Sequence, residues 1–456
     1  MKTIKIANKQ IESSLLKNTI QLLKRAGITL ILLSFFTYSQ AQEKVLTLNE
    51  AIQLGLENSK QLKLSQSRVN EAISQYNQVK DKALPTASTS FAYNHTEILN
   101  DQFQIGNEEA FDLPARTNAF IGTASIQQLI FQGNKLKFAK ESTNLLTQVA
   151  RLDIDKNKQD IIYNIINAYY NLYKVLQSEK VVEQNLRVID RQIKQSERFF
   201  EQGIVTKNDV LRFQLEKSNI QLTGLDLENN RKVVNYNLDI LLGLPESTIL
   251  IINKIADDQT IIVGLPNYID NALNNREELK QISLQTQVAD YNIKSAKADL
   301  LPTLGVGANM YFINPSGKFI PPVNQSLAPV SIAATLTWNL SNLWTNKNKV
   351  AEARIKKEEI QINEGIFQDQ IKTQVNQDYQ NYLKSVERIK ILQTSITQAQ
   401  ENDKILESKY ENTIASVTDR IDANNQLFQS QINLELAKAD AILAYYTLLK
   451  STATLK

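Results

Sequence analysis

The feature that most constrains the fold of this chain is a long run of residues, from Asn134 to Gln202, that contains neither glycine nor proline. A second run, from Asn346 to the C-terminus, is interrupted only by Gly365. Each run predicts a helix of close to 70 residues, which at about 1.5 Å per residue spans roughly 100 Å. Apolar residues recur in both runs at steps of four and three, which predicts supercoiled helices; they are Ile162, Ile166, Tyr169, Tyr173 and Leu176 in the first, and Val375, Tyr379, Tyr382, Val386 and Ile389 in the second.

Each predicted long helix ends at a short break and is followed by a return helix. The breaks are Gly203-Ile204-Val205 and Thr413-Ile414-Ala415. After each break comes a hydroxyl residue, Thr206 or Ser416, with an aspartate three residues later, and this spacing is typical of a capping box at a helix start. The sequence therefore predicts two long helical hairpins.

The order of elements repeats because the sequence is internally duplicated. A shift of 217 positions aligns the segment from Leu48 with the segment from Leu265, and Leu84-Pro85-Thr86 with Leu301-Pro302-Thr303. A shift of 210 positions aligns the two breaks and their flanking residues. Such a long period indicates two large units and not a solenoid. We predict a first repeat over 42–263 and a second over 264–456, each with a helix, two strands and a helical hairpin.

Each repeat opens with a predicted helix of about 35 residues, over 48–82 and 265–299, which ends at Leu-Pro-Thr because proline disfavours a helical residue before it. Two extended segments follow in each repeat. Residues 330–340 alternate apolar and small or polar side chains over eleven positions, and a tilted membrane strand needs about 9 to 11. The other predicted strands cover 88–95, 120–127 and 305–313; Phe91, Tyr93, Tyr311 and Phe312 are candidates for a membrane–water interface.

Residues 1–41 predict a secretory signal peptide. They contain six basic side chains, one acidic side chain, an apolar run of about ten residues from Gly27 to Phe36, and the small-residue sequence Ser39-Gln40-Ala41. The remainder has 45 basic and 47 acidic residues, so it offers no general basic surface for nucleic acid. No cysteine follows the predicted cleavage site, which excludes an N-terminal lipoprotein anchor.

Composition also argues against an enzyme. The chain has no cysteine and a single histidine, His95, so it lacks the ligands of most zinc or iron–sulfur sites. It contains no GxSxG, HExxH, GxGxxG or P-loop motif. We expect no catalytic residues, no metal and no cofactor.

Four strands cannot close into a membrane barrel, because the smallest barrels have about eight. If the alternating segments face lipid, their edges must pair with other copies of the chain, and a trimer would supply twelve strands and twelve rod-forming helices. The fold class predicted is therefore mainly α with a membrane β-barrel: four strands and long coiled-coil hairpins per chain, and a trimeric 12-stranded barrel continued by an α-helical tunnel. A soluble sheet edge would show the same alternation.

The sequence resembles the TolC-like outer-membrane efflux proteins over nearly the whole chain after residue 41. The residues that carry the resemblance are Leu48-Asn49-Glu50-Ala51-Ile52 with Asn58, Leu84-Pro85, Gly133-Asn134, and the segment from Phe200 to Leu211 around the first break. The resemblance implies a homotrimer in the outer membrane of a Gram-negative bacterium that extends into the periplasm. It also implies export of substrates delivered by an inner-membrane pump and a periplasmic adaptor, contact with outer-membrane lipid, and no nucleic acid partner.

The resemblance also implies site residues at the periplasmic end. Asp419 and Asp422 match the positions that form acidic rings at the closed entrance, and stacked carboxylates favour cations. Both aspartates also suit a helix start for structural reasons. Tyr410 and Asp209 match a closed-state latch, although Tyr410 equally fits a coiled-coil seam position. The family's basic latch residue is replaced by Ala415.

The tip turns predicted to meet the adaptor contain Gly203 and Thr206 in the first repeat, and Thr413 and Ser416 in the second. Because Thr413 stands where the first repeat has glycine, the two tips are not expected to be equivalent. The alternative function is a secreted or periplasmic coiled-coil structural protein without a pore.

Overall fold

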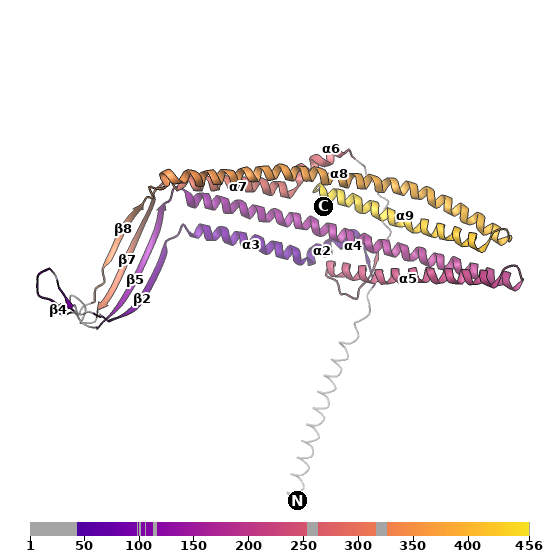
Figure 1. The fold of residues 1–456 in the computed structure, drawn as a ribbon, viewed down its shortest axis with the longest axis horizontal. Coiled ribbons are helices and arrows are strands. Elements are labelled where there is room, and N and C mark those ends of the chain that lie inside the picture. Colours follow the sequence, from indigo (N-terminus) through magenta and orange to yellow (C-terminus); the bar gives the residue numbers. More distant parts are fainter. Residues whose placement is uncertain are drawn as a thin grey trace, which may run out of the picture. The chain divides into compact units, whose positions relative to one another are not determined.

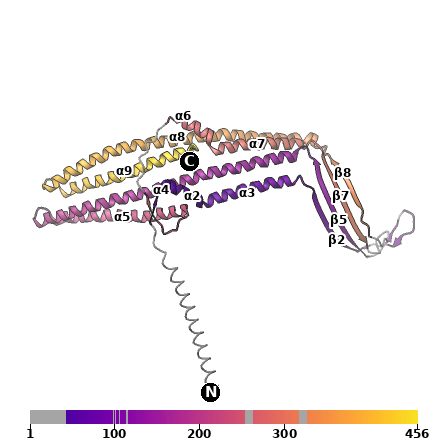
Figure 2. The same cartoon turned by 180° about the vertical axis from the view of Figure 1, so that it is seen from behind.

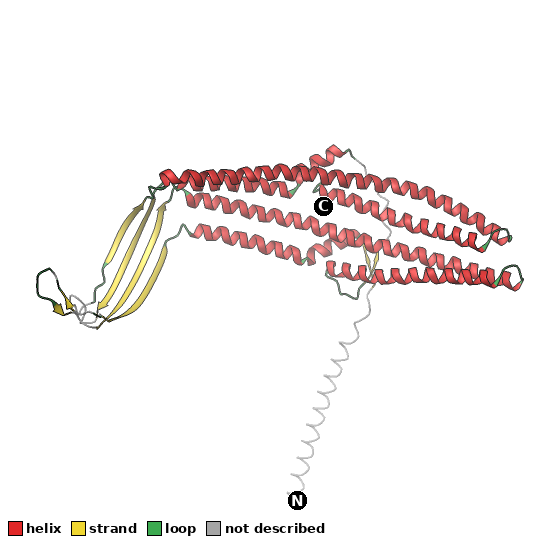
Figure 3. Ribbon diagram, in the orientation of Figure 1, coloured by secondary structure: helices red, strands yellow, loops and turns green. Residues whose placement is uncertain are grey.

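The computed structural model describes residues 43–97, 99, 102–104, 106–112, 116–252, 263–315 and 326–455. The predicted signal peptide, and parts of the two loops predicted over 97–117 and 314–329, lie outside these residues. The strands are β1 Glu43–Leu46, β2 Thr86–Glu97, β3 Gln102–Phe103, β4 Phe111–Asp112, β5 Arg116–Phe131, β6 Ile249–Ile252, β7 Thr303–Pro315 and β8 Val330–Thr337 (Figure 1). The helices are α2 Leu48–Asn58, α3 Lys60–Asp81, α4 Lys135–Glu201, α5 Lys207–Leu242, α6 Leu265–Asn275, α7 Glu277–Ala298, α8 Asn342–Glu411 and α9 Val417–Ser451 (Figure 3).

The chain forms two compact units, and each contains residues from both halves of the sequence. The tip unit comprises the described residues of 43–58, 167–252 and 396–436, and the sheet unit those of 59–166, 263–395 and 437–455. The predicted repeats run along the chain, whereas the two units cut across α4, α8 and α9. The duplication stays a prediction, supported by the order helix pair, strand pair, hairpin in each half.

The two long helices have the predicted extent and buried face. α4 has 67 residues and α8 has 70. In the tip unit the heptad residues Tyr169 and Tyr173 are buried, and in the sheet unit Ile162, Ile166 and Val375 are buried. Removal of this apolar stripe from water stabilises the helices far more than their intrinsic propensity does. None of the helices in the described part of the chain combines the length and the apolar character needed to cross a membrane.

The prediction of one 35-residue helix at the start of each repeat was wrong. Each segment consists of two helices, α2 and α3 or α6 and α7, separated at Ser59 or at Arg276. Ser59 ends the first helix because its side chain accepts a hydrogen bond from the Leu62 N–H and caps α3. Just before this break, the Asn58 amide donates to the carbonyl of Leu242 at the end of α5, over a distance of 2.8 Å. A break made by a side-chain cap of this kind is not marked by a glycine or a proline in the sequence.

The sheet unit contains an antiparallel sheet with the strand order β2-β5-β7-β8, whose neighbouring strands appear side by side in Figures 1 and 2. The four predicted strands are confirmed, but their lengths differ. β2 and β7 are longer than predicted, and β8 ends at Thr337, so Trp338 and Leu340 lie beyond it. The central pair, β5 and β7, joins the two halves of the sequence, while β2 and β8 are the open edges.

The register places most of the large apolar side chains on one face of this sheet and most of the hydroxyl and amide side chains on the other, which also carries Ile121 and Ile313. The apolar face carries Phe91, Tyr93, Phe120, Ile126, Leu304, Val306, Met310, Phe312, Val330, Ile332 and Leu336. The polar face carries Ser88, Ser90, Thr123, Ser125, Asn309, Tyr311, Ser331 and Thr335. The hydroxyl pairs Ser88–Ser125 and Ser90–Thr123 lie 2.8 Å apart. Tyr311 thus lies on the polar face, unlike the other three predicted interface aromatics.

The tip unit contains a small parallel pair, β1 with β6, which the sequence analysis did not predict. The side chain of Asn235 in α5 holds β6 in place: its amide donates to the Thr248 carbonyl, and its carbonyl oxygen accepts from the Leu250 N–H. The same amide donates to the carboxylate of Asp239, which is fully buried. Burial raises the pKa of Asp239 to about 6, against an ordinary value of 3.8. One oxygen of this carboxylate has no partner within the described residues.

Asp239 predicts a pH dependence of stability. Since its folded-state pKa is raised, its contribution to the free energy of unfolding is fully present below about pH 4 and is lost as the pH rises through about 6. Replacing Asp239 with Asn removes the buried charge. We expect the D239N variant to melt at a higher temperature than the wild type at pH 8, with a smaller difference between pH 8 and pH 5, as measured by circular dichroism in detergent.

Asp226→Asn is the matched control, because Asp226 is an exposed aspartate of the same helix. D226N should melt as the wild type does at both pH values. A D239N variant less stable than the wild type at pH 8 would contradict the assignment of a destabilising buried charge.

Candidate functional site: the tips of the helical hairpins

The two hairpin turns have the same backbone geometry although their sequences differ. Gly203 has a φ of 74° and Thr413 a φ of 61°, both in the left-handed region. In each turn the next residue, Ile204 or Ile414, donates its N–H to a carbonyl five residues back, at 2.8 and 2.7 Å. Thr413 adopts this conformation against the preference of a β-branched residue, and its hydroxyl donates to the carbonyl of Asn412. The backbones of the two tips are therefore equivalent, whereas their side chains are not.

Both return helices begin with a complete capping box, as the sequence predicts. The carboxylate of Asp209 accepts hydrogen bonds from the N–H and the hydroxyl of Thr206, at 2.8 and 2.7 Å. Asp419 accepts the same two bonds from Ser416, at 3.2 and 2.7 Å. Each aspartate also lies at a positive helix N-terminus, where its charge is favourable.

The two aspartates predicted to form acidic rings are exposed at the start of α9. Hydrogen bonds from Ser416 lower the pKa of Asp419, so this carboxylate is charged at neutral pH. Asp422 lies three residues further along the same helix, one turn away and on the same face. The tip of the second hairpin thus presents two acidic side chains to solvent in this chain.

Tyr410 lies in an apolar cluster, which the seam interpretation predicts. Its side chain is buried, and its ring centroid lies 5.8 Å from that of Phe199 and 5.7 Å from that of Phe213. Burial raises its pKa; the nearby Ser196 side chain acts against this rise, and the charge of Asp209 adds to it. Its hydroxyl has no hydrogen-bond partner within the described residues. No bond joins Tyr410 to Asp209 in these residues, because the Asp209 carboxylate is bonded to Thr206.

Two polar contacts, which the sequence analysis did not predict, connect the hairpins within the tip unit. The guanidinium of Arg212 in α5 donates to the hydroxyl of Thr418 in α9 at 2.6 Å. Deeper in the seam, the amide of Asn424 donates to the carbonyl oxygen of Asn185 in α4 at 2.9 Å, and both side chains are buried. Ala415 stands where the family has a basic latch residue. In this chain a basic side chain reaches the start of α9 from the other hairpin instead, as Arg212.

The sequence analysis also missed the most deeply buried cation of the described residues. Arg420 is 1% exposed and forms an ion pair with Asp403; its second nitrogen lies 3.8 Å from Glu407. Both acids lie on α8, so this cluster joins the two helices of the second hairpin. The spacing in the sequence could have indicated that Arg420 is buried. It lies three residues after Val417 and four before Asn424, at the steps of a coiled-coil seam, and both of these side chains are buried.

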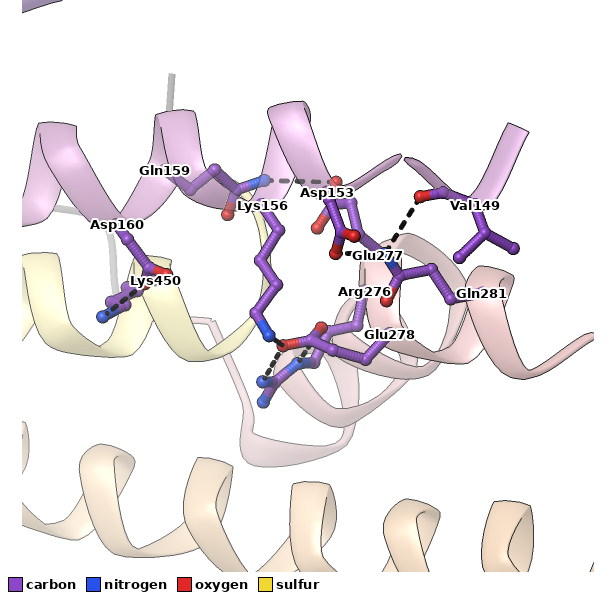
Figure 4. Close-up of polar contacts among 10 residues, drawn as sticks. All are labelled: Val149, Asp153, Lys156, Gln159, Asp160, Arg276, Glu277, Glu278, Gln281 and Lys450. Atoms are coloured by element: carbon purple, nitrogen blue, oxygen red, sulfur yellow. Dashed lines mark hydrogen bonds and ion pairs between the residues drawn. The ribbon is translucent and has the colours of Figure 1, made fainter. Parts of the chain in front are cut away.

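A cavity of about 390 Å³ in the sheet unit is lined by residues of α4, α7, α8 and α9. Figure 4 shows the polar contacts along one side of it. Glu278 lies 3.0 Å from Arg276 and 3.9 Å from Lys156, and Lys450 lies 2.9 Å from Asp160. Since each of these cations has a carboxylate partner, the cluster ties the start of α7 and the end of α9 to α4.

Comparison with known proteins identifies this arrangement. The family model described as "Outer membrane efflux protein" matches residues 51–244 and 268–454. The outer membrane efflux protein BepC of Brucella suis biovar 1 (strain 1330) is 21% identical over 350 residues, which cover 74% of each chain. The alkaline protease secretion protein AprF of Pseudomonas aeruginosa is 23% identical over 268 residues, 58% of this chain and 55% of AprF.

Solved structures show the same fold. The Campylobacter jejuni CmeC outer membrane channel superposes with a TM-score of 0.72 at 14% identity, covering 92% of this chain and 91% of CmeC. The predicted fold of the chain, a four-stranded sheet with long helical hairpins, is thereby confirmed, and the channel hypothesis is favoured over the poreless structural protein. The chain belongs to the outer membrane efflux protein family, and it is an outer-membrane channel for efflux or secretion that extends into the periplasm.

Proposed function

We propose that this chain is the passive outer-membrane duct of a tripartite export system, which receives its substrates from an inner-membrane pump through a periplasmic adaptor and has no catalytic activity of its own. The observation that carries this proposal is the pair of unlike faces of the β2-β5-β7-β8 sheet. An apolar outer face and a polar inner face are the requirements of a membrane wall around a water-filled lumen.

The dimensions of the apolar face fit a bilayer. It runs along β5 from Phe120 to Phe131, twelve residues, which is about 36 Å along the strand and about 28 Å across a membrane at a tilt of roughly 40°. Beyond Phe120 the same face turns polar, with His95 beside Asn118 and Glu97 paired with Arg116. This change marks the proposed outer boundary of the lipid contact.

The exposed surfaces of the tip unit support assembly with further copies. Phe200 and Tyr410 occupy equivalent positions of the two hairpins, but Tyr410 is 3% exposed and Phe200 is 43% exposed. In a ring of alternating hairpins, Phe200 would be covered by the second hairpin of the next copy, as Tyr410 is covered by the first hairpin of its own. A stripe of exposed leucines on α5 needs the same cover: Leu211, Leu215, Leu222 and Leu225.

The two tips carry the proposed adaptor contact. Ile204 is 47% exposed and Ile414 is 75% exposed, each at the turn of its hairpin. Apolar side chains at solvent-exposed turns suit an apolar partner surface. The equal backbone geometry of the turns at Gly203 and Thr413 supports six similar docking tips per trimer.

The entrance is proposed to be controlled by charge and by the links between hairpins. Three copies of Asp419 and Asp422 would form two acidic rings. For the latch, Tyr410 and Asp209 remain proposed members, and the contact between Arg212 and Thr418 supports the addition of a basic member from the first hairpin.

The assembly can be tested on the leucine stripe. Replacing Leu215 and Leu222 with Glu places two charges where another copy would bury two leucines, each worth about 1.5 to 3 kcal/mol. We expect the heat-resistant trimer to be lost in semi-native electrophoresis, together with ion conductance in planar bilayers. Gln214→Glu with Gln221→Glu, which has the same spacing on the same helix, should retain both. Trimers of unchanged heat resistance in the leucine variant would refute the proposed interface.

The acidic rings can be tested by cation block. Replacing Asp419 and Asp422 with Asn removes six carboxylates from a trimer while keeping an acceptor for the capping bonds. We expect block of the single-channel current by a trivalent cation to weaken at least about tenfold. Glu401 and Glu411, exposed acids of α8 on the same hairpin, serve as a control pair when replaced with Gln. Equal block in the wild type and in the aspartate variant would exclude a ring.

Two single substitutions test the two proposed links between the hairpins separately. Arg212→Ala should raise the conductance of the resting channel, because it removes a charged hydrogen bond worth about 1.5 to 3 kcal/mol. Tyr410→Phe removes a hydroxyl that has no partner within the described residues, so it tests the latch directly. An increased resting conductance in Y410F would support Tyr410 as a latch member; an unchanged conductance would leave it as a packing residue.

A further inference from the structure

Both tryptophans of the chain lie where the sheet of the sheet unit meets its helices. Trp338 follows β8 and is 49% exposed, and Trp344 lies in the first turn of α8 and is 63% exposed. The indole N–H of Trp338 donates to the carbonyl of Leu300 at 3.1 Å. Exposed leucines surround the same junction: Leu84, Leu301, Leu340 and Leu343. Tryptophans with a satisfied N–H and an exposed ring are typical of a membrane–water interface.

A group of lysines lies on the helix ends at the same junction, and both halves of the sequence contribute to it. The lysine collar consists of Lys80, Lys135 and Lys137 from the first half and of Lys297, Lys347 and Lys349 from the second. A shift of 217 positions aligns Lys80 with Lys297, and a shift of 212 positions aligns the pair Lys135 and Lys137 with the pair Lys347 and Lys349.

The excess of positive charge is local. The four helix ends at the junction, residues 76–82, 135–141, 294–299 and 342–349, contain nine lysines and three acidic residues. The chain after residue 41 carries 45 basic and 47 acidic residues. At the other end of the sheet, residues 97–116 contain five acidic residues and one arginine. The sheet therefore separates a basic junction from an acidic loop region.

Helix stability does not account for this placement. Lys80 and Lys297 suit the negative C-terminal ends of α3 and α7, but Lys135 and Lys137 lie in the first turn of α4, whose positive end favours acids. Lys347 and Lys349 are the sixth and eighth residues of α8, where the dipole of that helix gives a lysine no advantage. The carboxylate of Asp299 forms ion pairs with two of the six lysines, Lys135 and Lys349. Within the described residues, no carboxylate forms an ion pair with Lys80, Lys137, Lys297 or Lys347. This surface is therefore complementary to an external anion.

We propose that the lysine collar binds the phosphate groups of anionic phospholipids in the periplasmic leaflet of the outer membrane. This inference rests on the proposed contact of the apolar sheet face with lipid, because that contact places the junction at the level of the headgroups. Lys347 lies one turn beyond Leu343 and Trp344 on the same side of α8. Its ammonium group is therefore next to the apolar surface that these two side chains form. Lysine contributes about a fivefold preference per charge near an anionic surface.

The test uses tryptophan fluorescence, since both tryptophans report on the junction. Protein without the signal peptide is reconstituted into vesicles of zwitterionic phosphatidylcholine mixed with brominated phosphatidylglycerol, or with brominated phosphatidylcholine. Bromine quenches tryptophan on contact, so the ratio of the two quenching curves gives the relative affinity for the anionic lipid. We expect a ratio of about five or more at low salt, falling towards one at 1 M NaCl.

The variant replaces Lys80, Lys137, Lys297 and Lys347 with Gln, and leaves the two lysines that bind Asp299. Its ratio should fall to about one while its heat-resistant trimer is retained. The control replaces four exposed lysines far from the junction with Gln: Lys180, Lys194, Lys384 and Lys404. Its ratio should stay at the wild-type value.

The outcomes separate this inference from the proposed function. Equal quenching by both lipids in the wild type at low salt, or the same preference in the wild type and in the collar variant, would overturn the collar while leaving the sheet in the membrane. No quenching by either lipid would overturn the membrane placement of the sheet and the collar with it. Because the salt dependence is measured on the wild type, the test holds even if the variant fails to assemble.

Discussion

The open edges of the four-stranded sheet are the constraint on which the rest of this protein depends. Among the described residues, β2 and β8 each pair on one side only, and their other backbone groups would need partners before the apolar face could enter lipid. A single chain cannot supply them, because its strands are too few to close. In the proposed function, assembly is therefore a condition for membrane insertion, and the helices that continue from the strands share the symmetry of the sheet.

The predicted duplication would explain how one chain can present two different surfaces at equivalent positions. The backbone of the two hairpin turns is the same, as the left-handed conformations of Gly203 and Thr413 show. Their seam residues differ in environment, with Tyr410 between two phenylalanine rings and Phe200 exposed. The seam position of one hairpin is thus covered within the chain, and that of the other is exposed, where the proposed assembly would place a neighbouring copy.

Much of this fold was predictable because long periodic patterns determine it. The heptad of α4, the alternation in β5 and the capping boxes at Thr206 and Ser416 involve residues close together in the sequence. Features set by contacts between distant residues were missed. The break at Ser59 depends on a side-chain cap, the β1–β6 pair depends on Asn235, and the buried charge of Arg420 is compensated from another helix. The site residues were located by resemblance, and the structure gives their surroundings in one chain.

The seam between the hairpins contains polar groups that no protein group satisfies within the described residues. The amide of Gln192 has no partner on either atom, and the hydroxyls of Ser196 and Tyr410 have none. All three side chains are buried in the tip unit. Groups of this kind are normally met by internal water, which exchanges its hydrogen bonds at little enthalpic loss. Because these groups would gain hydrogen bonds in water, separating the hairpins at this point costs less free energy than separating an apolar seam of the same size.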